Sequence, residues 1–127
     1  MSGEGGGRLY SRTPSLGRAE VAAFGVICFH AQQCVEKYIK ALLVFRGTAF
    51  PKTHNIRVLR TLLPPKLRPK LDRKVQDRLT RYAAILRYPD AGTDVPLTEA
   101  RKAVAIARRV RREVRRHLPR AALRRKK

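Results

Sequence analysis

One cluster of side chains near the C-terminus has the residue types and spacing for chemistry on a phosphate ester. His117 follows Arg112 with four residues between them, and it follows Arg111 with five. An arginine at this spacing could hold a phosphate while the histidine acts as general acid or base on a 2′-hydroxyl or a leaving oxygen. The candidate catalytic residues are therefore Arg111, Arg112 and His117.

Several features of the sequence weigh against this catalytic interpretation. Arginine is frequent throughout the last third of the chain, so an arginine at the right distance from any histidine is expected by chance. On an ideal helix Arg111 and Arg112 point roughly 120–140° away from His117. Glu113, four residues before His117, is the better placed neighbour. The sequence therefore predicts that these residues are not catalytic, unless a symmetric dimer brings Arg111 of one chain near His117 of the other.

A second set of polar residues predicts a binding surface. His30, Gln33, Lys37 and Lys40 recur at heptad-like spacing, and Glu36 is placed to pair with Lys40 across one helical turn. This stripe is either an ordinary solvated face or a surface for a nucleotide, RNA or partner. The full set of candidate nucleotide- or RNA-binding residues is His30, Gln33, Lys37, Lys40, Arg87, Asp90, Arg108 and Arg115. His54, by contrast, is expected to be a helix-cap or first-turn residue and not a base.

The charge of the chain indicates what class of molecule it meets. Its 127 residues contain 30 Lys and Arg but only 9 Asp and Glu, which gives a net charge of +21 at pH 7. Such a field attracts nucleic acid, nucleotides, anionic lipid or an acidic partner, although it also serves solubility. The two cysteines, Cys28 and Cys34, have neither metal-site nor disulfide spacing. We therefore expect no metal, no cofactor and a cytoplasmic location.

Apolar residues recur every three or four positions in four segments, and no segment alternates with the period of a strand. We expect Thr53 and Thr98 to cap two of the helices, and Gly47 and Pro119 to stop two of them. The sequence predicts an all-α fold, an up-and-down bundle of four to five helices in one domain. The expected helices cover about 18–46, 54–63, 69–87 and 98–118; the domain covers 18–119, between a flexible tail at 1–17 and a basic tail at 120–127.

Four short motifs, in order, resemble those of the HEPN domain family. The run from Phe29 to Leu43, FHAQQCVEKYIKALL, resembles the signature helix of that family. Gly47 and then Thr53-His54 resemble the family's segment immediately after the signature helix. Arg87-Tyr88-Pro89-Asp90 resembles its RYP segment, and an amphipathic helix from Thr98 completes the order. The resemblance covers about residues 20–118.

The resemblance implies a helical bundle that forms a homodimer. Many members of the family are encoded beside a small nucleotidyltransferase, in a toxin–antitoxin-like pair. Others are metal-independent ribonucleases with an Arg-x(4–6)-His motif. This chain departs from the family at its start, where a Gly/Ser/Pro-rich stretch stands in place of a first helix of about twenty residues. The bundle is therefore expected to be short of one wall, so that either a partner or a second copy covers the gap or the domain is marginally stable.

These observations leave three hypotheses for function. The first is a nucleotide- or RNA-binding interaction module that acts with a nucleotidyltransferase partner. The second is a metal-independent endoribonuclease toxin. The third, a protein that lies on a membrane surface, is disfavoured because the apolar face of the last helix is rich in Ala and Val and has no Trp or Phe to anchor it. No membrane association is expected.

Overall fold

The computed structural model describes residues 18–85 and 95–119, and the side chains from residue 23 onward. These residues form helices and contain no strand, which confirms the all-α helical bundle. The helices are α1 (Arg18–Phe45), α2 (Ile56–Thr61), the short 3₁₀ helix η3 (Pro65–Leu67), α3 (Arg73–Tyr82) and α4 (Leu97–Arg115). The expected tails at 1–17 and 120–127 lie outside the described residues, as do Arg87 and Asp90.

The long helix α1 ends where the sequence predicts. Gly47 has a φ of 71°, the left-handed conformation that glycine adopts without steric cost. The amide of Gly47 donates to the carbonyl of Val44 over 2.9 Å, and that of Thr48 donates to Leu43 over 2.9 Å. These bonds satisfy carbonyl groups that the end of a helix would otherwise leave without partners.

Both expected threonine caps are wrong. The N-cap of α2 is Asn55, whose side chain accepts from the amide of Val58 over 3.1 Å. Thr53 instead accepts from the amide of Asn55, and so shapes the turn before the cap. Helix α4 begins at Leu97 after Pro96, which leaves Thr98 inside the first turn. Pro96 is the N-cap, with the extended backbone (φ −80°, ψ 161°) that this position requires, and it makes no side-chain capping bond.

Helix α3 is shorter than expected, and so is α4 at its C-terminal end. Residues before α3 are held outside it because the backbone amide of Lys70 donates to the Glu113 carboxylate of α4 over 3.1 Å. The helix therefore starts after Asp72, whose side chain accepts from the amide of Val75 over 2.9 Å. At the other end of the chain, α4 stops at Arg115, so His117 lies in the turn beyond the helix.

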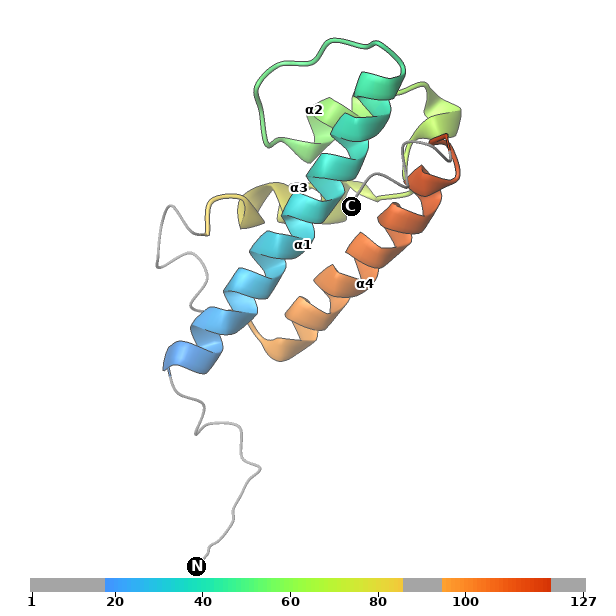
Figure 1. The fold of residues 1–127 in the computed structure, drawn as a ribbon. Helices are drawn as coiled ribbons and strands as arrows, with labels where there is room; N and C mark the ends of the chain where they lie inside the picture. The colour runs from blue at the N-terminus through green and yellow to red at the C-terminus, as the bar shows by residue number, and fades with distance from the viewer. Residues whose placement is uncertain (1–17, 86–94, 120–127) are drawn as a thin grey trace, which may run out of the picture.

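The main packing contact joins α1 and α4. Figure 1 shows the two helices side by side, with α3 crossing behind α1 and η3 beside the C-terminal end of α4. The facing residues on α4 are small: Ala100, Ala103 and Ala107 are all buried. Small side chains let the two backbones approach closely. The buried apolar residues that α1 contributes to the core are Cys28, Ala31, Val35, Ile39, Leu42 and Leu43.

Polar groups tie the shorter helices to this pair. The Tyr82 hydroxyl of α3 donates to the Glu99 carboxylate of α4, and burial together with this bond holds the pKa of Tyr82 far above its ordinary value. The backbone amide of Ile56, in the first turn of α2, donates to the Thr80 hydroxyl of α3 over 3.0 Å. In the part of the chain that the structure describes, no helix is long and apolar enough to cross a membrane.

The positive φ of Gly47 gives a first testable prediction. A Cβ at this position would meet nothing within 4 Å, so the cost of Gly47→Ala is conformational and not steric. We expect this change to lower the free energy of unfolding by about 1 kcal/mol. Gly47→Asn should cost less, because asparagine tolerates the left-handed region better. Urea denaturation of both variants measures the difference; equal stabilities for wild type and Gly47→Ala would contradict the prediction.

Candidate nucleic-acid interface

An extended segment between η3 and α3 is docked against the C-terminal half of α4. Glu113 accepts from the backbone amide of Lys70, and the Arg109 guanidinium donates to the carbonyl of the same residue. Arg109 and Glu113 also lie one helical turn apart and form an ion pair of 3.4 Å. One carboxylate and one guanidinium of α4 thus hold both polar groups of the Lys70 backbone.

This docking creates a cleft of about 280 Å³ between the segment and α4. Its walls carry six cationic side chains and one carboxylate. We call it the basic cleft; its lining residues are Lys66, Leu67, Arg68, Lys70, Arg109, Arg112, Glu113, Arg116 and His117. A concave site with a strong excess of one charge concentrates field lines and attracts the opposite charge.

Two of the six cations of the basic cleft bind backbone carbonyls of the described residues, and the other four do not. Arg68 is bound to backbone, because its guanidinium donates to the carbonyls of Leu63 and Thr61 over 2.8 and 3.1 Å. Arg109 likewise holds the Lys70 carbonyl. Within residues 23–85 and 95–119, no hydrogen bond or ion pair engages the side chains of the four other cations of the cleft, which are Lys66, Lys70, Arg112 and Arg116.

The structure separates the three candidate catalytic residues. Arg112 and His117 line the same basic cleft. Arg111 lies elsewhere: its Nε donates to the Tyr38 hydroxyl of α1 over 3.2 Å. The Glu113 carboxylate binds other groups than His117: it accepts from the backbone amide of Lys70 and pairs with Arg109. Within one copy of the chain, Arg112 is the arginine that shares a site with His117.

Another group of the predicted binding residues lines a different surface. His30 of α1 and Arg108 of α4 border a shallow groove of about 280 Å³ between these two helices. We call it the apolar groove; its lining residues are Ile27, His30, Ala31, Cys34, Val104, Ala107, Arg108 and Arg111. Arg115 is half-buried and lines neither the basic cleft nor the apolar groove, and Lys37 is exposed.

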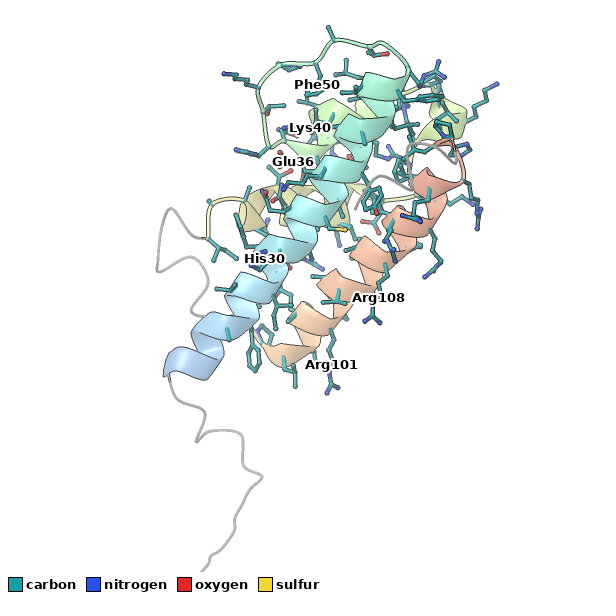
Figure 2. All side chains as sticks on the ribbon, in the orientation of Figure 1. His30, Glu36, Lys40, Phe50, Arg101 and Arg108 are labelled. Atoms are coloured by element: carbon teal, nitrogen blue, oxygen red, sulfur yellow. The ribbon has the colours of Figure 1, made fainter. Side chains whose placement is uncertain are left out.

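Lys40 of the polar stripe on α1 contacts a buried carboxylate, Glu36, whereas Gln33 donates to the side-chain oxygen of Gln32 over 3.0 Å. The expected pair with Lys40 is present at 2.7 Å, and Gln32 donates to the same carboxylate over 2.6 Å. The Nδ1 of His54 lies 3.0 Å from both carboxylate oxygens. Figure 2 shows Glu36 and Lys40 beside Phe50, whose ring centroid lies 5.7 Å from the Lys40 ammonium. His54 therefore binds a carboxylate of α1 and is not the cap or first-turn residue that we expected.

Hydrogen bonds decide the charge of Glu36. Burial alone would raise the pKa of this carboxyl, but hydrogen bonds from Lys40, Gln32 and His54 outweigh burial and lower the pKa below its ordinary value of 4.5. Glu36 is consequently ionised at neutral pH. Because an ionised carboxylate only accepts, Nδ1 of His54 must be the donor, which leaves Nε2 of this half-exposed ring pointing away from Glu36.

Comparison with known proteins identifies the family of the chain. A family model described as HEPN domain matches residues 18–117. The chain belongs to the HEPN domain family. Searches of curated proteins and of solved structures found no match. The HEPN signature helix is α1, and the Glu36–His54 contact joins that helix to the Thr53-His54 motif through a bond between side chains 18 residues apart.

Sequence reasoning missed half of the basic cleft of this HEPN domain. Lys66, Arg68 and Lys70 alternate in a segment punctuated by prolines, which is typical of an ordinary solvated linker. The prolines around them, Pro64, Pro65 and Pro69, favour extended chain, which holds for Lys70 but not for Lys66, because Lys66 lies in η3. In the residues that the structure describes, no group of three or more His, Cys, Asp or Glu is arranged to hold a metal ion.

The lowered pKa of Glu36 predicts how the stability of the HEPN domain depends on pH. Its folded pKa is below its unfolded pKa, so ionised Glu36 stabilises the fold above about 4.5, and this contribution is lost as pH falls through the folded pKa. We expect Glu36→Gln to lower the free energy of unfolding by about 2 kcal/mol at pH 7. In urea denaturation, the difference from wild type should shrink as pH falls from 4.5 through the folded pKa.

The matched control for this prediction is Asp77→Asn. Asp77 pairs with Arg57 over 3.0 Å, but both side chains are about half exposed, so the pair should contribute little. A Glu36→Gln penalty that stays constant from neutral to strongly acidic pH would show that the loss comes from altered packing and not from the carboxylate charge.

Proposed function

We propose that this HEPN domain is an RNA-binding interaction module and that the basic cleft receives the RNA backbone. The observation that carries the proposal is the convergence of cations from two segments: Lys66 and Lys70 from the linker, and Arg112 and Arg116 from the C-terminal end of α4 and the turn after it. Lysine and arginine neutralise phosphates and release their counterions, which drives binding with little regard to sequence. The net charge of +21 supports the same class of ligand.

The composition of the basic cleft favours a polynucleotide backbone over a single nucleotide. In the part of the chain that the structure describes, its lining includes no Phe, Tyr or Trp on which a base could stack. Stacking on aromatic rings supplies much of the recognition of isolated bases. Several cations spread along a cleft fit successive phosphates of one strand better than one nucleotide.

The proposal includes the partners that family resemblance implies. A small nucleotidyltransferase would form the other half of a toxin–antitoxin-like pair, and the domain would act as a homodimer. The charge of the chain supports the nucleotidyltransferase part of this proposal, because a basic surface favours association with an acidic one. Both partners are proposals, and RNA binding is testable with the chain alone.

The proposal predicts a steep dependence of RNA affinity on salt. Each lost phosphate contact to a single strand reduces the slope of log affinity against log salt by about 0.7. Replacing Lys66, Arg112 and Arg116 with alanine should therefore flatten the slope by about 2. Fluorescence anisotropy with an unstructured uridine oligonucleotide, from low to high potassium chloride, measures the slope.

A matched triple variant separates the cleft from general charge. Arg73, Lys74 and Arg81 are cations of α3 outside the basic cleft, and their replacement with alanine removes the same net charge. We expect this control to keep nearly the wild-type slope. Equal flattening in both triple variants would mean that the cleft has no special role, and the circular dichroism of each variant verifies its fold.

The alternative function is that of a metal-independent endoribonuclease. The observation that favours it is that Arg112 and His117 line one cleft, although ideal helical geometry predicted that they point far apart. The helix ends at Arg115, so that geometry does not apply to His117. Arg112 would hold the scissile phosphate, and the exposed imidazole of His117 would take or give the proton.

RNA cleavage distinguishes the two functions. As a binding module, the wild-type protein should leave labelled RNA intact over hours in EDTA. As an endoribonuclease, it should cleave RNA in EDTA, and His117→Ala should slow cleavage by about 10²- to 10⁴-fold while RNA affinity is retained. The control is His30→Ala, another exposed histidine that lies outside the basic cleft. Gel analysis of single-turnover reactions gives the rates, and we expect no cleavage.

A further inference from the structure

RNA binding in the basic cleft does not explain the apolar groove between α1 and α4, which has a volume of about 280 Å³. Its floor is formed by small residues, Ala31 of α1 and Ala107 of α4, and its walls by Ile27 and Val104. Ile27 is 38% exposed, although it lies on the apolar stripe of α1. An elongated apolar surface between two helices is the shape in which a third helix packs, with its side chains between theirs.

The charges around the groove restrict what can occupy it. Arg108 and Arg111 border it from α4, and His30 borders it from α1. Figure 2 shows His30 and Arg108 on these two helices, with Arg101 nearer the start of α4 and away from the groove lining. Among the side chains that the structure describes, which begin at residue 23, no Asp or Glu lines the groove. A complementary helix would carry an apolar stripe with carboxylates beside it.

A second copy of the chain is a poor match for this groove. Two-fold packing of groove on groove would bring Arg108 and Arg111 close to the same residues of the partner. Like charges placed against one another across an interface oppose association. The groove therefore calls for a partner of opposite charge.

We propose that the apolar groove binds an acidic amphipathic helix of a partner protein. The apolar stripe of that helix covers Ala31, Val104 and Ala107, and its carboxylates pair with Arg108 and Arg111. This inference rests on the proposed function: it identifies the surface through which the interaction module binds its partner, and it predicts that the partner presents an acidic amphipathic helix. RNA and partner would then bind different sides of α4.

The probe is a synthetic helical peptide of about five turns, with leucine at positions i, i+3, i+4 and i+7 and glutamate at the flanking positions. A second peptide has lysine in place of every glutamate. The reporter is Cys34, a half-buried free thiol in the groove, whereas Cys28 is fully buried outside it. Mass spectrometry follows alkylation of Cys34 at about pH 8.5, and an alkaline pH is needed because burial raises the pKa of this thiol.

We expect the glutamate peptide at saturation to slow alkylation of Cys34 by about tenfold or more, and the lysine peptide to have little effect. Ile27→Glu should abolish protection, because it places a carboxylate on the apolar wall. The matched control is Val44→Glu, an exposed apolar residue of α1 outside the groove, which should leave protection unchanged.

A charge swap tests the role of Arg108 and Arg111, the two arginines that border the apolar groove. The double variant Arg108→Glu, Arg111→Glu should lose protection by the glutamate peptide and gain protection by the lysine peptide. Arg101→Glu, an exposed arginine of the same helix, should behave like wild type. This reversal of preference cannot come from a general loss of stability, since an unfolded variant would leave Cys34 unprotected with either peptide.

Three outcomes would overturn the inference. Equal protection by both peptides would show that Arg108 and Arg111 do not discriminate between an acidic and a basic helix. No protection by either peptide would show that the groove does not take a helix. Protection that rises with protein concentration in the absence of peptide would assign the groove to a second copy. RNA binding is tested on the other side of α4 through Arg112 and Arg116, so an intact salt slope beside a failed peptide experiment would overturn this inference alone.

Discussion

The packing of α1 against α4 is the contact on which the rest of this structure depends. Ala100, Ala103 and Ala107 allow α4 to lie close along α1, and the longer side chains of Val35 and Ile39 complete the core. Because the contact is made by small residues, its specificity comes from shape and not from any one large side chain. It fixes the direction of α4, and thereby fixes where each arginine of α4 faces. The basic cleft and the apolar groove are both consequences of that orientation.

The circumference of α4 is divided among three environments. Successive residues are about 100° apart around an α-helix. Val110 and Val114 face the core, Arg108 and Arg111 border the apolar groove, and Arg112 belongs to the basic cleft. Two arginines adjacent in the sequence, Arg111 and Arg112, therefore lie on different surfaces. A run of arginines that looks uniform in the sequence has separate roles once one face of the helix is buried.

The sequence predicted the parts of the fold that depend on local patterns. Apolar periodicity placed α1, and Gly47 ended it, because a left-handed residue is a local requirement. The helix caps were not predictable in the same way. Thr53 and Asn55 are both good capping residues, and the amide of Ile56, next to the actual cap, is held by Thr80, far away in the sequence. Helix existence is a local property, whereas helix boundaries depend on tertiary hydrogen bonds.

The candidate site was predictable only in part, for the same reason. Arg112 and His117 were found from their spacing, but the linker half of the basic cleft depends on a contact between Lys70 and Glu113, 43 residues apart. Glu113 is one of only nine acidic residues in the chain. Two of these scarce carboxylates fix groups around them: Glu36 pairs with Lys40 and binds His54, and Glu113 pairs with Arg109 and binds the Lys70 amide. The scarce acidic residues, more than the abundant arginines, therefore determine where the positive charge of this HEPN domain becomes a site.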